Sequence, residues 1–496
     1  MMIYNRKIGR LISRCSLLIV LLCAPILSRA QAPTWIDIGW REFLRSVVEM
    51  DGQYYAVGTL GYEDETRDAV VVKYKTAEEY THNVISTPDS NMFFSDIAAH
   101  NDRLFVAGAI GTDTGDVYNR HFIGELNTDL ELLWKKSYEY YEATSKIYAD
   151  YIVAGSDKLY VGSLIKIEGI KHGMVNSYNL QGDSLDHYWF ETPYSDIDDM
   201  THNLDSTALL LVGERFEPYS GYPTYAELSY DFENILIDDI VATYGRDILS
   251  LKQETDSTYI MGGRLSETGF PGGVNGYNQH CLNRMDEQFN TSLLTTQGDF
   301  GENEDPGWNN SIDFRNSDTI FFAATHNGAF SYPPPNSSQL WVGYADNQLI
   351  TQGIVKLGGE NDYFNTRDII ATSDGGCVVV GDHWDLSVDP AKLDLMIVKV
   401  DPEDFITTSV PESLSLSANV TVVPNPVRDK ATVELKDIPK TALLDVYDMH
   451  GRQMGSYPCS KTKISIPCGR WNSGVYFYAV NHRGERIAAG KFVKGE

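Results

Sequence analysis

Residues Thr372–Asp401 read TSDGGCVVVGDHWDLSVDPAKLDLMIVKVD, and the features of this stretch recur along the chain. An Asp-Gly-Gly turn comes first, followed by the apolar run Cys377–Val380, which ends at the small residue Gly381. A polar loop leads to a second apolar run, Leu393–Val400. Short apolar runs separated by turn residues indicate antiparallel strands.

The apolar run that ends in a small residue occurs seven times, at steps of 49 to 62 residues. The small residues at its end are Gly58, Gly108, Gly162, Gly213, Gly262, Ala324 and Gly381. Self-similarity at a fixed period of this length is the signature of a repeat architecture. The repeat therefore decides the fold class.

Each repeat contains further strand-like segments in register with the small residue. A short apolar segment, often opened by an acid, comes 12 to 16 residues before it, and a third strand with room for a fourth follows it. Four-stranded meanders favour a propeller, because radial packing buries each sheet between two neighbours. We predict an all-β chain with a seven-bladed β-propeller at residues 31–410, its last blade completed by the strand-like segment Thr34–Trp40. The long, degenerate sixth repeat leaves six or eight blades open.

The best-formed repeat, Thr372–Asp401, resembles the loose propeller repeats of secreted bacterial proteins. Such repeats occur in proteins of many functions, so the resemblance implies a fold and no particular activity.

Residues 1–30 have the features of a secretory signal peptide. Arg6, Lys7 and Arg10 precede an apolar run of 13 residues, Cys15–Leu27, and small residues precede a cleavage site after Ala30. The apolar run is too short for a comfortable membrane span, and no other stretch is apolar enough to cross a bilayer.

Charge divides the remaining chain into two unlike parts. Residues 31–418 carry 23 Lys and Arg against 62 Asp and Glu, a net charge of −39, whereas residues 419–496 carry 12 against 7, a net charge of +5. An acidic field of this size argues against nucleic acid as a partner and favours cations, basic partners or neutral glycans. Solubility alone is the alternative explanation.

Four cysteines follow the signal peptide. Cys459 and Cys468 are spaced to close a small loop, and such a disulfide stabilises by about 2–3 kcal/mol outside the cytoplasm. Cys281 and Cys377 lie in strand-like runs, and we expect them to be buried as small hydrophobic residues.

The long loops between second and third strands all emerge on one face of a propeller. They are rich in aromatic residues, which suit sugar rings or an extended peptide. The alternative is that these aromatics pack against their own loops. The candidate ligand-binding residues on this long-loop face are Tyr219, Tyr222, Phe270, Phe330, Tyr332 and Trp384.

Acidic residues offer two candidate cation sites. One loop carries Asp299, Glu302, Glu304 and Asp305, a set suited to calcium, although its spacing departs from the EF-hand pattern and a solvated turn is the alternative. A second set of acidic residues lies at the start of the first strand of several repeats and would line the propeller axis. These carboxylates would either hold a divalent cation or cap backbone N–H groups. These residues are Asp96, Asp150, Asp199, Asp247 and Asp368.

Catalytic motifs are absent from the sequence. It contains no H-E-x-x-H, C-x-x-C, G-x-S-x-G or phosphate-binding loop. The body is therefore interpreted as a binding module for glycan or protein. A hydrolase or lyase acting on extracellular polysaccharide, with its site in the propeller funnel, is the alternative.

The C-terminal segment has a composition of its own. A Ser-rich linker at residues 411–418 precedes alternating strands and turns, which predict a small immunoglobulin-like β-sandwich at residues 419–496. This segment resembles the type A C-terminal sorting domain of type IX secretion in the Bacteroidota. The matching residues are Pro424, Asn425, Pro426, Gly451, Gly474, Tyr476 and Lys491.

The resemblance implies a route out of the cell. Proteins with this domain cross the inner membrane by a signal peptide and the outer membrane through the type IX machinery, which is thus an expected partner. The domain is commonly removed before surface attachment or release. The expected destination is the cell surface or the extracellular space.

Overall fold

The structure is a computed structural model. It describes residues 34–39, 41–64, 66–88, 90–112, 118–139, 147–167, 170–190, 194–217, 220–239, 246–266, 278–288, 290–297, 303–328, 334, 336–388, 392–405, 420–436, 439–448, 452–482 and 485–495. The chain divides into two compact units, Met1–Ile406 and Thr407–Glu496. The described residues form β strands and one short 3₁₀ helix, η1 (Pro402–Phe405), so the all-β prediction is confirmed. The predicted signal peptide and linker lie outside the described residues.

The first unit consists largely of four-stranded antiparallel meanders in chain order. Their strands are β2 (Arg41–Met50), β3 (Gln53–Gly61), β4 (Arg67–Thr76) and β5 (Glu79–Ile85); β6 (Ser90–His100), β7 (Arg103–Thr112), β8 (Tyr118–Leu126) and β9 (Leu132–Glu139); β10 (Ile147–Ala154), β11 (Lys158–Ile167), β12 (Ile170–Asn179) and β13 (Ser184–Trp189); β14 (Tyr194–His202), β15 (Ala208–Glu217), β16 (Ser220–Ser229) and β17 (Ile235–Asp239); and β18 (Arg246–Thr255), β19 (Thr258–Ser266), β20 (Asn278–Asp286) and β21 (Thr291–Gln297).

The last two sheets of this unit depart from the simple meander. One has its inner strand divided in two, and its strands are β22 (Glu304–Pro306), β23 (Ile312–Asn316), β24 (Thr319–His326), β25 (Gln339–Ala345) and β26 (Thr351–Leu357). The other contains β27 (Asp362–Ala371), β28 (Cys377–Asp385) and β29 (Lys392–Val400), and its fourth strand is the N-terminal β1 (Thr34–Ile36). The pairing of β1 with β29 confirms the closure expected of the segment Thr34–Trp40.

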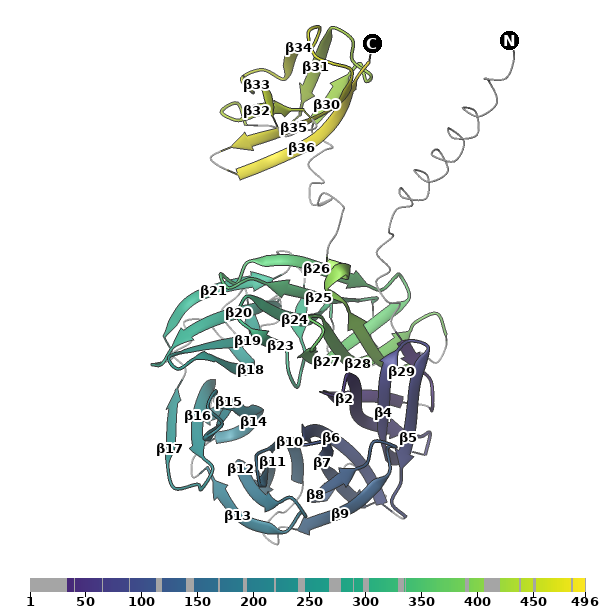
Figure 1. Ribbon diagram of the computed structural model, residues 1–496, viewed down its shortest axis with the longest axis vertical. Coiled ribbons are helices and arrows are strands. Elements are labelled where there is room, and N and C mark those ends of the chain that lie inside the picture. Colours follow the sequence, from purple (N-terminus) through teal and green to yellow (C-terminus); the bar gives the residue numbers. More distant parts are fainter. Residues whose placement is uncertain are drawn as a thin grey trace, which may run out of the picture. The chain divides into compact units, whose positions relative to one another are not determined.

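Figure 1 shows these sheets arranged around a common centre, with β2, β6, β10, β14, β18, β23 and β27 innermost. Neighbouring sheets pack face to face, so second strands such as β3 are buried on both faces and read as continuous apolar runs. The outermost strands alternate instead, as the burial of β9 does. The propeller-like arrangement therefore follows from the repeat.

The inner strands share an irregularity that positions the candidate site. A β-bulge interrupts the pairing of six inner strands with their second strands, and each leaves one residue unpaired between two registered ones. In three of these strands the residue after the bulge is the repeated acid, at Asp96, Asp199 and Asp368. The unpaired residues are Arg45, Ser95, Asp150, Asp198, Leu249 and Arg367.

The second unit contains two sheets that enclose one core. One sheet has β30 (Val420–Val423), β31 (Lys430–Leu435) and β34 (Lys463–Pro467), and the other has β33 (Gln453–Pro458), β32 (Leu443–Tyr447), β35 (Gly474–His482) and β36 (Glu485–Lys494). Alternate residues of both sheets face inward, among them Val433, Val446 and Phe492.

Candidate functional site

The repeated acids bind the backbone of the next sheet. Each carboxylate accepts a hydrogen bond from a backbone N–H on the inner strand that follows, and in three of the four pairs this N–H lies two residues beyond the bulge residue. The pairs are Asp96 with Ile152 N (2.7 Å), Asp199 with Leu251 N (2.9 Å), Asp313 with Ala371 N (2.7 Å) and Asp368 with Val47 N (2.9 Å). Of the predicted set, Asp96, Asp199 and Asp368 thus hold neighbouring sheets together, while Asp150 is a bulge residue and the side chain of Asp247 lies outside the described part.

Burial changes the protonation of these carboxylates. Desolvation raises the pKa of Asp96 to about 6, and it raises the pKa of Asp199 and of Asp368 to about 7. Lys252 forms an ion pair with Asp313. Burial lowers the pKa of the Lys252 ammonium, but the pairing outweighs it, so the pKa is raised. Because their oxygens already accept hydrogen bonds from backbone N–H groups, these carboxylates have a structural role.

A row of aromatic rings and guanidinium groups crosses four inner strands or the loops beside them. We call it the arginine ladder, and it consists of Trp308, Arg367, Phe43, Arg45 and Phe93. The Arg367 guanidinium lies 5.1 Å from the Trp308 ring centre and 5.6 Å from that of Phe43. The Arg45 guanidinium lies 5.3 Å from Phe43 and 4.9 Å from Phe93. These are cation–π distances, so each arginine is held between two rings.

Both arginines of the ladder are bulge residues, and Arg367 has a carboxylate behind it. Its Nε donates to Oδ1 of the buried Asp382 at 3.3 Å, and Asn365 donates to the same carboxylate. The Arg367 side chain is 17% exposed, and its terminal nitrogens have no hydrogen-bond partner among the described residues. Trp308 is 47% exposed, and the loop that carries it is fixed by a hydrogen bond from Asn309 N to Arg367 O at 2.8 Å.

Sequence reasoning missed the arginine ladder. Arg45 and Arg367 occupy the same position of the repeat, one residue before the post-bulge position, and this register was the available signal. The contacts that complete the ladder join residues far apart in the chain, such as Phe43 and Arg367. No local motif contains both.

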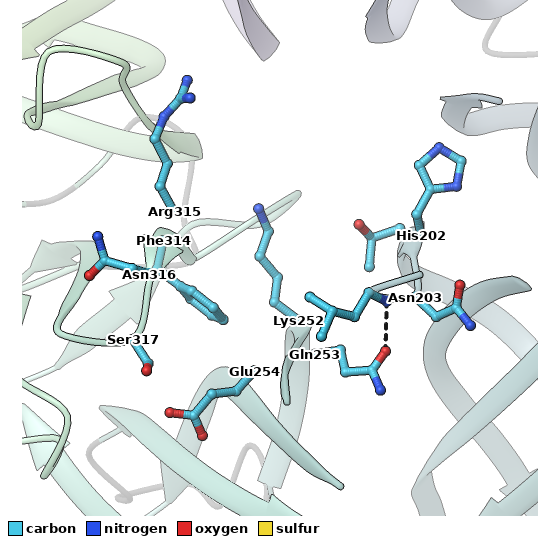
Figure 2. A pocket seen from close by; sticks show the side chains of 11 residues that line it. His202, Asn203, Lys252, Gln253, Glu254, Phe314, Arg315, Asn316 and Ser317 are labelled. Atoms are coloured by element: carbon cyan, nitrogen blue, oxygen red, sulfur yellow. Dashed lines mark hydrogen bonds between the residues drawn. The ribbon is translucent and has the colours of Figure 1, made fainter. Parts of the chain in front are cut away.

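A pocket of about 300 Å³ lies at the turns between first and second strands of three successive sheets. Its lining is mainly polar, with amides, hydroxyls and the ring of Phe314, and Figure 2 shows Lys252 and Arg315 extending from different strands beside it. The lining residues are Thr201, His202, Asn203, Leu204, Lys252, Gln253, Glu254, Phe314, Arg315, Asn316 and Ser317.

The charged groups of this pocket are paired. Arg284 binds Glu254 through two nitrogens, at 2.7 and 2.8 Å, and Arg315 contacts Glu49 at 2.6 Å. Gln253 accepts a hydrogen bond from the backbone N–H of Leu204 at 2.7 Å. The contacts of Arg315 and Gln253 connect different sheets, whereas Arg284 and Glu254 belong to one sheet. These polar groups therefore stabilise the propeller-like arrangement.

The predicted aromatic residues of the long-loop face fall mostly beyond the described part. Tyr219, Phe270, Phe330 and Tyr332 lie outside the described residues, as does the side chain of Tyr222, which belongs to β16. Trp384 is a correction. It lies within β28, is only 7% exposed and packs with Tyr363 and Leu393. The strand continues past Gly381 and stays buried as far as Trp384, so this tryptophan is a core residue.

The predicted calcium residues are divided in the same way. Asp299 and Glu302 lie outside the described residues, whereas Glu304 and Asp305 form part of β22 and are buried. Glu304 contacts His326 at 3.1 Å, and Asp305 lies 3.7 Å from Arg264. Across the part of the chain that the structure describes, no group of three or more acidic, His or Cys side chains is placed to hold a metal ion.

The sorting-motif residues occupy the second unit. The side chain of Asn425 accepts a hydrogen bond from Val493 N at 2.9 Å, Tyr476 is buried and donates to Asn472 O at 2.8 Å, and Lys491 is exposed on β36. Gly474 has a φ of 155°, and Pro424 and Pro426 are exposed beside Asn425, while Gly451 lies outside the described residues.

The predicted disulfide is not formed in the structure. Cys459 and Cys468 are free thiols buried in the core of the second unit, and Cys468 contacts Ile466 O at 3.3 Å. Cys281 and Cys377 are also buried, as expected of small core residues.

Solved structures with similar folds are distant in sequence. PorZ, an essential surface component of the type IX secretion system of Porphyromonas gingivalis, is 11% identical with a TM-score of 0.30, covering 91% of this chain and 69% of PorZ. A family PL25 ulvan lyase is 9% identical with a TM-score of 0.46, covering 76% of this chain and 98% of the lyase. The β-propeller domain of the trilobed protease from Pyrococcus furiosus is 9% identical with a TM-score of 0.41, covering 77% and 99%.

Among curated proteins, no sequence matches the chain. Helices long and apolar enough to cross a membrane do not occur in the described residues. The family of secretion system C-terminal sorting domains matches residues 421–494. This match confirms the resemblance drawn from the tail, and it places the protein at the cell surface or outside the cell after type IX export. Residues 421–494 are therefore a secretion system C-terminal sorting domain.

Proposed function

We propose that the exported body is a carbohydrate-binding module. It is a seven-bladed propeller at residues 31–410, and it follows a signal peptide at residues 1–30. A linker at residues 411–418 joins it to an immunoglobulin-like sorting domain that the type IX machinery recognises. The carbohydrate site is the arginine ladder, with the exposed Trp308 as its platform.

The observation that carries this proposal is the division of roles among the inner-strand side chains. The repeated carboxylates are hydrogen-bonded to backbone N–H groups, so they are unsuited to act as the paired acid and base of a glycosidase. The ladder instead offers an exposed indole and guanidinium donors. Aromatic rings stack on sugars, and a planar fork of N–H donors binds their oxygens.

Binding and turnover on the same polysaccharides test the proposal. The purified chain from residue 31 onward is applied to a glycan array, and the polymers that it binds are then incubated with it and assayed for new reducing ends and unsaturated products. Binding without turnover is expected, and Trp308→Ala should weaken it. Sustained turnover would instead establish the hydrolase or lyase alternative, and a chain that binds no glycan would overturn the proposal.

A further inference from the structure

We propose that the arginine ladder selects a sugar chain bearing an isolated negative charge, such as a single uronic acid or sulfate on an otherwise neutral oligosaccharide. This inference rests on the proposed carbohydrate-binding function and names the ligand class for the same site. Arg367 recognises the anion, Trp308 supports the sugar ring beside it, and Asp382 is a positioning residue behind Arg367.

The geometry of Arg367 supports the anionic group. The Trp308 and Phe43 rings confine the guanidinium between them, and the contact of Nε with Asp382 orients it. The terminal nitrogens have no hydrogen-bond partner among the described residues, and this pair of donors matches two oxygens of a carboxylate or sulfate. A lysine would supply the charge without this fixed fork.

The second guanidinium raises the local positive charge. Arg45 shares the Phe43 ring with Arg367, so two cations lie on successive inner strands within one row of stacked side chains. Asp382 is buried and hydrogen-bonded to Asn365 as well as to Arg367, which places it behind the guanidinium. Like-charged side chains held close together favour a ligand of opposite charge.

The charge of the whole body limits how much negative charge the ligand carries. Residues 31–418 have a net charge of −39, so a dense polyanion is repelled as it approaches. At physiological salt the screening length is about 8 Å, so the field beyond the site acts weakly on a ligand with one charged group. An isolated anionic group satisfies both the local cations and the acidic surroundings.

Oligosaccharides that differ only in charge separate the contribution of the anionic group to binding from that of the sugar rings. Calorimetry on the full chain from residue 31 onward uses xylotriose carrying one glucuronic acid, the methyl ester of that uronic acid, and plain xylotriose. Lactose 3′-sulfate and lactose form the sulfate arm, and heparin is the dense polyanion. We expect the singly charged sugar of at least one arm to bind more tightly than its neutral counterpart, on the order of tenfold or more, and heparin to bind weakly.

Variants test the residues. Arg367→Gln should weaken binding of the charged sugar much more than binding of its neutral counterpart and so remove the preference, whereas Arg367→Lys should retain part of the preference. Arg45→Gln is the second variant in case Arg367→Gln does not fold, and it should reduce the preference. Lys75→Gln, an exposed cation of β4 paired with Glu79, is the matched control and should change nothing.

The outcomes distinguish this inference from the function on which it rests. Equal affinity for charged and neutral sugars, unaffected by Arg367→Gln, overturns the inference and leaves the carbohydrate-binding function intact. Binding of none of these sugars and of no glycan on the array overturns both. Tight heparin binding overturns the requirement for an isolated charge.

Discussion

The small residue that ends each repeated apolar run has a steric cause. Gly58, Gly108 and Gly381 face the backbone of the inner strand just before its bulge, and a Cβ at any of them would lie 2.0 Å from a carbonyl oxygen. The close approach of the two strands therefore requires the absence of a side chain. Gly162 occupies the same position of its repeat, but its nearest neighbours are 3.5 Å away.

We predict opposite outcomes for alanine at two of these equivalent glycines. Gly108→Ala should lower the free energy of unfolding by about 1–3 kcal/mol, because the backbone carbonyl of Phe93 must move. Gly162→Ala is the matched control, and its added methyl group makes ordinary contacts with the side chains of Ile197 and Met200. Urea titration of both variants measures the difference. Equal losses of stability would show that the spacing to the carbonyl is not the cause.

These residues, together with Trp384, show which positions can be predicted from the local sequence and which cannot. The small positions could be predicted because several repeats share a close approach of two strands that excludes a Cβ, as at Gly58, Gly108 and Gly381. Trp384 was misassigned to a loop because the strand continues to Asp385 and the turn residues begin only at Leu386, beyond the expected end of the strand. An aromatic residue at a strand end has the same local signal whether it packs inward or lies on a rim.

At the level of elements, neighbouring inner strands are joined by a bulge and a carboxylate. The bulge interrupts the ladder of one strand, and an aspartate on the preceding inner strand accepts a hydrogen bond from a nearby N–H. The recurrence of the acid could be read from the sequence, and capping of backbone N–H groups was one of its two expected roles. The sequence could not show that the hydrogen-bond donor belongs to the next sheet, because Asp368 and Val47 are 321 residues apart.

This arrangement predicts a pH-dependent effect of Asp368→Asn. The pKa of Asp368 is raised to about 7 from an ordinary value of 3.8, so the folded state holds an extra proton between these values. The stability that this residue contributes is therefore fully present below pH 3.8, and it is lost progressively as the pH rises from 3.8 to about 7. Asparagine keeps an acceptor for Val47 N without the charge. At pH 8 the variant should be more stable than the wild type by about 1–3 kcal/mol.

The difference in stability between variant and wild type isolates the pH-dependent contribution of Asp368. Burial lowers the pKa of His121 and of His280 to about 3, and both therefore destabilise the folded state as the pH falls below about 6.5. Their effect is the same in wild type and variant, so it cancels in the difference. Urea titrations at pH 5 and pH 8 should show a smaller difference between variant and wild type at the lower pH. A constant difference at both would rule out ionisation of Asp368 as the cause.

For the whole molecule, the repeat and the tail could be predicted from the sequence, and the proposed binding site could not. The period of the repeat sets the fold, and the tail carries enough motif residues to be assigned to the sorting family. The arginine ladder depends instead on ring closure, because its members come from residues 43 to 45, 93, 308 and 367. Only the arrangement around the centre brings them together.

Export depends on a separately packed unit, and its core predicts how export fails. Tyr476 is buried against Trp471 and Phe492, with ring centres 4.9 and 5.8 Å away. Tyr476→Ala should cost about 3–4 kcal/mol, a large share of the stability of so small a domain. In a host with the type IX machinery, we expect the variant to fail to cross the outer membrane and to accumulate in the periplasm, as measured by cell fractionation and immunoblotting.

The neighbouring residue on the same strand supplies the control for this export experiment. Phe477 follows Tyr476 on β35 and points to the opposite face of the sheet, where it is 40% exposed. Phe477→Ser therefore leaves the core intact and should preserve the fold. If it also preserves export, the machinery reads a folded domain. Normal export of Tyr476→Ala, with the domain shown to be unfolded by protease sensitivity, would mean that a linear segment of the tail is sufficient.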